Sequence, residues 1–303
     1  MSYMQQEVLH FVENNDVKFI RLAFCGLDGI TRNLAILPAQ LPRALEEGIP
    51  FDLFAVDGFR DAALSDILLV PDPATLTVLP WRPQQGRVIR FYCALRNPDG
   101  SAFSCDTRGV LQAAVDDCAK AGYVCKMGTE CEFTLFLTDE HGHPTLTPLD
   151  NGGYMDMAPL DKGEDVRREI CLALDEMGIT PEASHHESGR GQNRIAFMFS
   201  DPLTCADNFL SFKTLVKAVA ARNGLYASFM PKPLPMDSGN GLHIDLSLYK
   251  DGQRLFRQRA DGHSLEAEAF MAGILSRCGE MTAFLNPTAN SYEIGRASCR
   301  ERV

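Results

Sequence analysis

The chain has 303 residues, 45% of them hydrophobic and 23% charged, which is the balance of a globular protein with room for two domains. Its net charge of −11 argues against a nucleic-acid partner or an anionic membrane, and no apolar run approaches the roughly 18 residues that a bilayer span needs. No signal peptide is visible at the start, and the ten cysteines contain no Cys-x-x-Cys pair, so we expect reduced thiols in a cytoplasmic protein.

The first third of the chain is predicted to be a small β-rich domain. Residues 17–25 and 88–95 are rich in β-branched and aromatic side chains, and each run ends at a turn that contains Asp-Gly. Between them, the segment around Pro71-Asp72-Pro73 has too little periodicity for a helix and too much proline for a central strand. We therefore expect an N-terminal domain at residues 1–103.

Helices and strands alternate in the rest of the chain, which predicts an α+β protein. Four segments have apolar residues at helical spacing: 106–122, 166–178, 209–224 and 265–284. Three segments have strand character: 128–137, 194–199 and 242–248.

Two polar clusters could carry chemistry. Glu130 and Glu132 stand two apart on a predicted strand, so both side chains point the same way, about 7 Å apart. Their charges repel unless a cation lies beside them or unless they face solvent, and both interpretations remain open at this point. His185, His186 and Glu187 run into a glycine-broken turn. Imidazole and carboxylate are the usual protein ligands of divalent cations at polar sites.

The strand at 242–248 alternates apolar and polar side chains. Its four apolar residues, from Leu242 to Leu248, are expected to face the core, with His243, Asp245 and Ser247 on the other face. Such a polar stripe more often faces solvent than binds a ligand. Asp52, in irregular sequence, is by itself more typical of a turn cap. Each of these features alone is indecisive.

The order of these features along the chain resembles the glutamine synthetase family, type I-like. The motifs cover residues 17–292: Phe51-Asp52 with Pro71-Asp72-Pro73, Gly128-x-Glu130-x-Glu132-Phe133, His185-His186-Glu187 with Gly191-Gln192, Phe229-Met230-Pro231-Lys232-Pro233, Gly241-Leu242-His243, and Asn286-Pro287-x-x-Asn290-Ser291-Tyr292. The chain is thereby identified as a C-terminally truncated member. The family's fold implies a β-grasp-like N-terminal domain at 1–103. It also implies an incomplete catalytic domain at 104–292, with a curved antiparallel sheet flanked by helices.

The resemblance implies an ATP-dependent carbon–nitrogen ligase. Family members join ammonia, or in some branches another amine, to the γ-carboxylate of glutamate through γ-glutamyl phosphate. Two divalent cations, Mg²⁺ or Mn²⁺, neutralise and orient the phosphate groups. The active sites lie between the subunits of a homo-oligomeric ring. The expected partners are therefore small molecules (glutamate, an amine and ATP) and further copies of the chain.

Nine residues fall at functional positions of the family. Glu132 and Glu187 resemble ligands of the first metal, and Glu130 and His243 resemble ligands of the second. The others are Glu182 and Ser247 at the nucleotide, Ser238 and Gly239 at glutamate, and Asp52 as the acid that a neighbouring subunit adds to the ammonium site.

Three positions depart from the family pattern. Arg194 stands where the family has a glutamate that is the third protein ligand of the first metal, and a guanidinium cannot be a ligand. Ser238 replaces an asparagine that contacts substrate, and Asp245 replaces an imidazole near the nucleotide. Arg194 puts the first metal site in doubt. With Arg190, which could help to hold an anion, it favours an alternative: a non-catalytic member that binds nucleotide or glutamate, or assembles with active subunits.

The chain stops before the end of the family's catalytic domain. Residues 293–303 match nothing in the family, and one reverse translation of them resembles a sequencing adapter, so we expect a non-native tail. A further metal-binding acid, phosphate-binding arginines and a flap would then be missing. The 303-residue chain is accordingly expected to be inactive.

Overall fold

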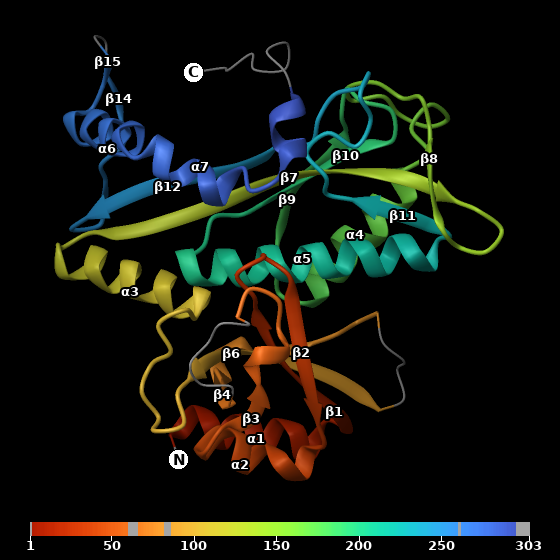
Figure 1. Ribbon diagram of the computed structural model, residues 1–303. Coiled ribbons are helices and arrows are strands. Elements are labelled where there is room, and N and C mark those ends of the chain that lie inside the picture. Colours follow the sequence, from red (N-terminus) through yellow and green to blue (C-terminus); the bar gives the residue numbers. More distant parts are fainter. Residues whose placement is uncertain (1, 60–65, 82–85, 260–261, 295–303) are drawn as a thin grey trace. The chain divides into compact units, whose positions relative to one another are not determined.

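The computed structural model describes residues 2–59, 66–81, 86–259 and 262–294 (Figure 1). The chain divides into two compact units, Met1–Asp117 and Cys118–Val303. The expected tail lies outside the described residues from position 295 onward. In the described part, no helix is both long and apolar enough to cross a membrane.

The first unit is built on a six-stranded sheet in the order β2-β1-β6-β4-β3, with β5 also on β6. The β1–β6 pair is parallel and the other pairs are antiparallel. Its strands are β1 (Val17–Cys25), β2 (Thr31–Ile36), β3 (Ile49–Asp52), β4 (Asp66–Pro71), β5 (Thr77–Val78) and β6 (Arg87–Arg96). Its helices are α1 (Tyr3–Asn14) and α2 (Leu41–Glu46), with short 3-10 turns η1 (Pro38–Gln40), η2 (Leu53–Ala55) and η3 (Pro73–Thr75).

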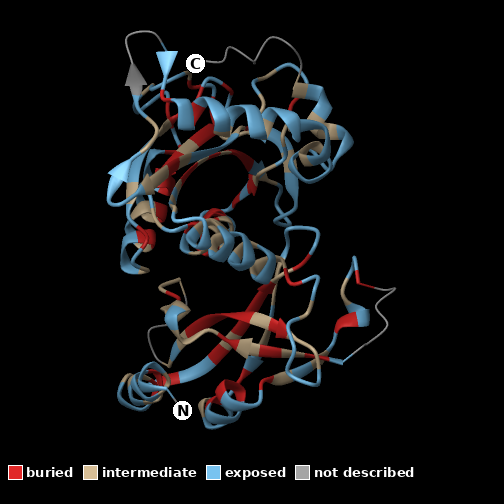
Figure 2. Ribbon diagram, turned by 90° about the vertical axis from the view of Figure 1, so that its left-hand side faces the viewer, coloured by how far each residue is buried: buried red, intermediate tan, exposed pale blue. Residues whose placement is uncertain are grey.

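The core of this unit lies between the sheet and the two helices. Buried residues, red in the ribbon of Figure 2, lie along the central strands. Leu22, Leu69 and Phe91 are among the buried hydrophobic residues of this core. The helix α1 begins at a capping box formed by Ser2 and Gln5, and adds Val8 and Val12 to the core. The alternation of buried and exposed positions in the strands follows from their period of two.

The prediction that the proline-rich segment contains no central strand is wrong. The strand β4 lies inside the sheet, between β6 and β3. Its proline, Pro71, is the last residue of the strand, opposite Cys93. A proline at that end removes no hydrogen bond from the interior of the ladder, so the strand tolerates it.

The second unit is built on a seven-stranded antiparallel sheet in the order β13-β12-β7-β10-β9, with β11 and β8 also on β7. Its strands are β7 (Val124–Thr138), β8 (Pro144–Pro148), β9 (Pro181–His186), β10 (Gln192–Phe197), β11 (Leu225–Ser228), β12 (Leu242–Lys250) and β13 (Gln253–Arg254). A separate hairpin joins β14 (Gln258–Arg259) and β15 (Gly262–His263). The helices are α4 (Glu164–Glu176), α5 (Pro202–Arg222), α6 (Leu265–Ser276) and α7 (Cys278–Leu285), with the 3-10 turn η4 (Ala289–Ile294), while α3 (Thr107–Lys120) spans the boundary between the units.

Two helices, α4 and α5, pack against each other and on this sheet (Figure 1). Aromatic rings fill the interface between sheet and helix: Phe212 of α5 lies 4.9 Å from Phe197 and 6.0 Å from Phe133, centroid to centroid. Such ring pairs stabilise a core beyond the area they bury. The predicted α+β class, the β-grasp-like first unit and the curved antiparallel sheet flanked by helices are confirmed.

Two local predictions in the second unit are wrong. The helix expected at 265–284 is two helices, α6 and α7, which break at Arg277. The apolar face of β12 is not fully buried, because Leu242 and Ile244 are 49% and 44% exposed. The helices α4 and α5 contact mainly β7, β9 and β11, so within the described part of the chain these two helices do not cover this end of β12.

Candidate active site

The pairing of β7 with β12 and β10 brings four predicted or anomalous residues to one face of the sheet. β12 places His243 opposite Glu130, and β10 places Arg194 opposite Glu132. Directly opposed residues of antiparallel strands project from the same face, so these side chains are neighbours. Asp245 follows on the same face, opposite Gly128.

Glu187 joins this group from the turn that follows β9. It is buried, and its Oε1 lies 3.0 Å from Nε2 of His185. The turn is closed by backbone hydrogen bonds from Glu187 to Gln192 and from Gln192 to Gly189. The His-His-Glu motif therefore delivers its acid to the cluster through the geometry of a tight turn.

Glu132 is held rigidly at the centre of the cluster. Its Oε2 accepts hydrogen bonds from Nε2 of Gln192 at 2.9 Å and from the backbone N–H of Gly241 at 2.8 Å. Burial raises the pKa of Glu132; the Gly241 hydrogen bond opposes this, and the nearby charge of Glu187 adds to it. A cation bound beside Glu132 would stabilise the charged form of this carboxylate.

A glycine lets Glu132 and His243 approach the same point. A Cβ at Gly241 would lie 3.1 Å from Nε2 of His243 and 3.5 Å from both carboxylate oxygens of Glu132. A larger residue would therefore crowd both candidate ligands. Carboxylate oxygens and an imidazole nitrogen form a donor set that suits Mn²⁺ or Mg²⁺.

Arg194 inserts a positive charge among the acids. Its guanidinium forms an ion pair with Oε2 of Glu130 and lies 3.5 Å from Oε1 of Glu187. Burial lowers the pKa of Arg194, while the carboxylate of Asp245 raises it. An arginine nevertheless stays protonated in a protein, so the charge is permanent. Its neighbour in the turn, Arg190, is paired with Asp237 at 2.9 Å, so each guanidinium already has a carboxylate partner within the chain.

The five remaining predicted site residues are Gly239, Ser238, Glu182, Ser247 and Asp52. Gly239 accepts a hydrogen bond from Gln192 through its carbonyl, and a Cβ there would lie 2.7 Å from the carbonyl oxygen of Pro231. Ser238 beside it is exposed, as is Glu182 on β9, while Ser247 on β12 is buried. Asp52 belongs to the first unit, where its exposed carboxylate accepts the N–H of Phe54 at 3.0 Å. The turn-cap interpretation of Asp52 is thus confirmed, and its role with substrate stays a prediction.

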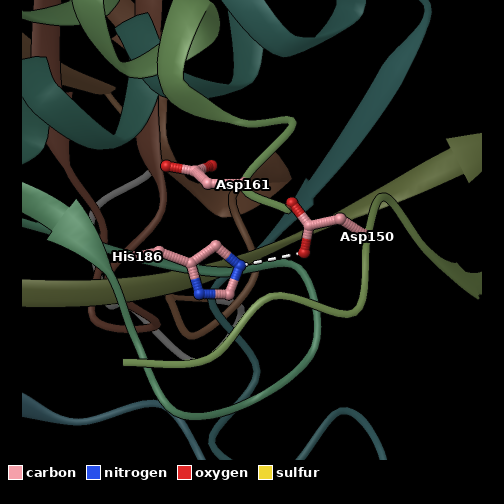
Figure 3. A group of neighbouring side chains, drawn as sticks. All are labelled: Asp150, Asp161 and His186. Atoms are coloured by element: carbon pink, nitrogen blue, oxygen red, sulfur yellow. Dashed lines mark hydrogen bonds and ion pairs between the residues drawn. The ribbon is translucent and has the colours of Figure 1, made fainter. Parts of the chain in front are cut away.

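A second polar cluster, Asp150, Asp161 and His186, was not predicted (Figure 3). One ligating atom of each lies within 4.8 Å of the others, and among the described residues this is the single group of three acids, histidines or cysteines that meets this distance. Nδ1 of His186 lies 2.6 Å from the carbonyl oxygen of Glu187, and Nε2 lies 2.9 Å from Oδ1 of Asp150. His186 thus connects this cluster to the turn that carries Glu187.

The donors around this second cluster argue against a metal ion there. Both oxygens of Asp161 are taken by the guanidinium of Arg167, which also donates to Oδ1 of Asn193 at 2.6 Å. Asp150 accepts the backbone N–H groups of residues 152, 162 and 191 as well as His186. Burial raises the pKa of Asp150, but these hydrogen bonds outweigh it and hold that pKa below its ordinary value. The carboxylates and the imidazole of the cluster are all hydrogen-bonded, although Nε of Arg167 is buried without a partner among the described residues, and this network fixes the Glu187 turn.

Comparison with known proteins gives two matching family models. The model of the glutamine synthetase catalytic domain matches residues 104–294, and that of the glutamine synthetase β-grasp domain matches residues 16–98. The glutamine synthetase of Clostridium saccharobutylicum is 45% identical over 294 residues, which is 96% of this chain and 66% of that protein. The glutamine synthetase of Methanosarcina mazei is 44% identical over 95% of this chain and 65% of its own length.

Solved structures show the same fold. A structure of GmaS in complex with ADP matches 96% of this chain and 67% of its own chain, with a TM-score of 0.85 at 32% identity. Plasmodium falciparum glutamine synthetase covers 97% of this chain and 63% of its own, with a TM-score of 0.87 at 24% identity, which is a likeness of fold alone. The chain spans about two thirds of the length of the curated relatives it matches.

Proposed function

The chain belongs to the glutamine synthetase family, and on that premise we propose that it ligates ammonia or another amine to the γ-carboxylate of glutamate at the expense of ATP. The carboxylate oxygen takes the γ-phosphoryl group to give γ-glutamyl phosphate and ADP. The amine nitrogen then attacks the acyl carbon, and phosphate leaves with the bonding electrons.

One observation carries this proposal. Glu130, Glu132 and His243 share one face of neighbouring strands, and Glu187 reaches the same region from the turn after β9. Carboxylates gathered in this way repel one another unless cations accompany them. A divalent cation held there would neutralise charge on the transferred phosphoryl group. The family likeness of the chain supports Mg²⁺ or Mn²⁺ as that cation and ATP as the phosphoryl donor.

The candidate ligands of the cluster do not all suit a metal ion equally well. Glu132 and His243, on either side of Gly241, are suited to hold one. The Glu130 and Glu187 carboxylates fit a cation poorly, because Arg194 already pairs with both. At about 4 Å and an effective dielectric of about 20, one pair of unit charges is worth roughly 4 kcal/mol, so a divalent cation beside the guanidinium meets roughly twice that repulsion. Two metal ions per site therefore require Arg194 to move.

The assembly and the domain division are part of the proposal. We place the N-terminal domain at 1–103 and the catalytic domain at 104–292, and the two family models, which end at 98 and begin at 104, support this boundary. The exposed position of Asp52 suits a residue offered to a neighbouring subunit of a ring. A cytoplasmic location suits the cysteines of the described part, all of which are free thiols.

Arg194 favours a second candidate function. A family member whose acids are neutralised by its own arginine could bind ADP or glutamate, or join active subunits, without turnover. Glu182 and Ser247 would then serve nucleotide binding, and Ser238 and Gly239 glutamate binding, in the absence of chemistry. The two functions differ in whether phosphate is released.

A chimera separates the two candidates. The chain spans 66% of the Clostridium saccharobutylicum enzyme, and we expect it to be inactive alone. Residues 1–294 would be joined to the remaining C-terminal part of that enzyme. We expect phosphate release from ATP that requires glutamate and Mn²⁺, and hydroxamate formation when hydroxylamine replaces ammonia.

The matched variants are Glu132→Ala and Glu140→Ala. Loss of a metal ligand should lower turnover on the order of 100-fold. Glu140, an exposed acid in the β7–β8 loop, should have no effect when replaced. A chimera that binds ADP but releases no phosphate under any condition would support the non-catalytic function instead.

A further inference from the structure

Arg194 contacts acids that belong to both predicted metal sites. Its guanidinium pairs with Glu130, which resembles a ligand of the second metal, and with Glu187, which resembles a ligand of the first. The side chains of Arg194, Glu130 and Glu187 are 23%, 30% and 11% exposed, so the pairing is largely shielded from water. Arg194 thus does more than remove one ligand, because it occupies the space between two others.

The charges of the cluster allow one divalent cation beside this arginine. Glu130, Glu132, Glu187 and Asp245 carry four negative charges on this face, and Arg194 cancels one of them. One divalent cation leaves the cluster with a net charge of −1, whereas two would leave it with a net charge of +1 beside a fixed guanidinium. The planar guanidinium is also held by two carboxylates. It therefore competes with a metal ion for the same carboxylate oxygens.

We propose that the guanidinium of Arg194 takes the place of one divalent cation, bridging Glu130 and Glu187, so that the chain binds one metal ion fewer than it would without the arginine. The two metal ions per site that the family resemblance implies serve only as the reference number. To that extent the inference rests on the proposed function. The acids of this chain are therefore partly neutralised even when no metal is present.

The number of Mn²⁺ ions bound per chain tests this inference. Free Mn²⁺ would be followed by electron paramagnetic resonance as it is titrated into the 303-residue chain and its variants. Arg194→Ala should bind one more Mn²⁺ per chain than the wild type. Arg194→Lys, which keeps a positive charge, should keep the wild-type number. Arg190→Ala is the matched control, because its guanidinium pairs with Asp237 outside the acid cluster, and it should also leave the number unchanged.

Thermal unfolding gives a second, independent readout. Without its guanidinium, Arg194→Ala leaves three acids facing one another, so in EDTA its melting temperature should fall below that of the wild type. Mn²⁺ should restore it, while shifting the wild type less. Equal Mn²⁺ numbers for wild type and Arg194→Ala, with equal shifts in melting temperature, would overturn the inference.

Neither readout uses glutamate, ATP or turnover. If the Mn²⁺ numbers differ as expected and the chimera does not turn over, the inference holds and the ligase proposal fails. If the chimera is active and the wild type binds as many ions as Arg194→Ala, the ligase proposal holds and the inference fails.

Discussion

At the scale of the residue, Gly191 shows how closely the candidate site is packed. Its φ is +62°, and a Cβ there would lie 2.7 Å from the carbonyl oxygen of Leu135 and 3.1 Å from the backbone nitrogen of Leu149. Its own carbonyl accepts the N–H of Leu135 at 2.8 Å, so the turn and β7 are held together by backbone. A side chain at this position would push the Glu187 turn away from the strand that carries Glu130 and Glu132.

Gly191→Ala is therefore expected to destabilise the protein by more than the usual cost of a left-handed alanine, which is about 1–2 kcal/mol. Gly142→Ala is the matched control, because Gly142 has φ +80° and nothing within 4 Å of its would-be Cβ. Urea unfolding measures both free energies. Equal losses for the two variants would contradict the close approach at Gly191.

The candidate ligands could be found from sequence, and their partners could not. Glu130, Glu132, Glu187 and His243 belong to short motifs whose order is informative. The pairing of Arg194 with Glu130 depends on strand register and side-chain conformation, and no local sequence pattern encodes either of these. The same is true of Asp150, which lies in an irregular segment 36 residues before its partner His186. Only a signal of long-range pairing would have revealed that network.

At the scale of the element, the network around Asp150 ties three segments together. Asp150 follows β8, His186 ends β9, and Gly191 precedes β10, and the carboxylate bonds to both of the latter. Its side chain is 1% exposed, so each of these hydrogen bonds is protected from water. The turn that presents Glu187 depends on this carboxylate for its shape.

Asp150→Ala is expected to cost about 3–5 kcal/mol, because it leaves several buried donors without an acceptor. Asp150→Asn keeps one acceptor oxygen and should cost less, about 1–3 kcal/mol. Asp139→Asn is the control: Asp139 also accepts two backbone N–H groups in a loop, but its side chain is 41% exposed. Urea unfolding compares the three variants. A loss for Asp150→Ala no larger than that for Asp139→Asn would show that the network does not hold the turn.

Periodicity located the long elements and failed on the short ones. The helices α3, α4 and α5 and the strands β7, β10 and β12 were anticipated because each repeats its pattern over enough residues. The strand β4 was missed because prolines obscure its end. The break between α6 and α7 was missed because apolar residues resume at Met281, although the polar Ser276-Arg277 pair and Gly279 mark it in the sequence.

At the scale of the whole molecule, each unit has a buried cysteine whose reactivity shows whether the core around it is closed. Cys93 in the first unit and Cys131 in the second are 1% and 3% exposed, whereas Cys105 and Cys278 are exposed. Burial raises the pKa of both buried thiols far above the usual range. The thiolate is the reactive form, so a buried cysteine reacts only when its surroundings open.

We therefore expect iodoacetamide to label Cys105 and Cys278 at least about 100-fold faster than Cys93 and Cys131 under native conditions. Peptide mass spectrometry after timed labelling measures each site separately. In strong denaturant all four should react at similar rates, which serves as the control. With rising urea, Cys93 should lose its protection together with the first unit and Cys131 together with the second. If the units unfold independently, the two midpoints will differ; rapid native labelling of either buried thiol would mean that the core around it is open.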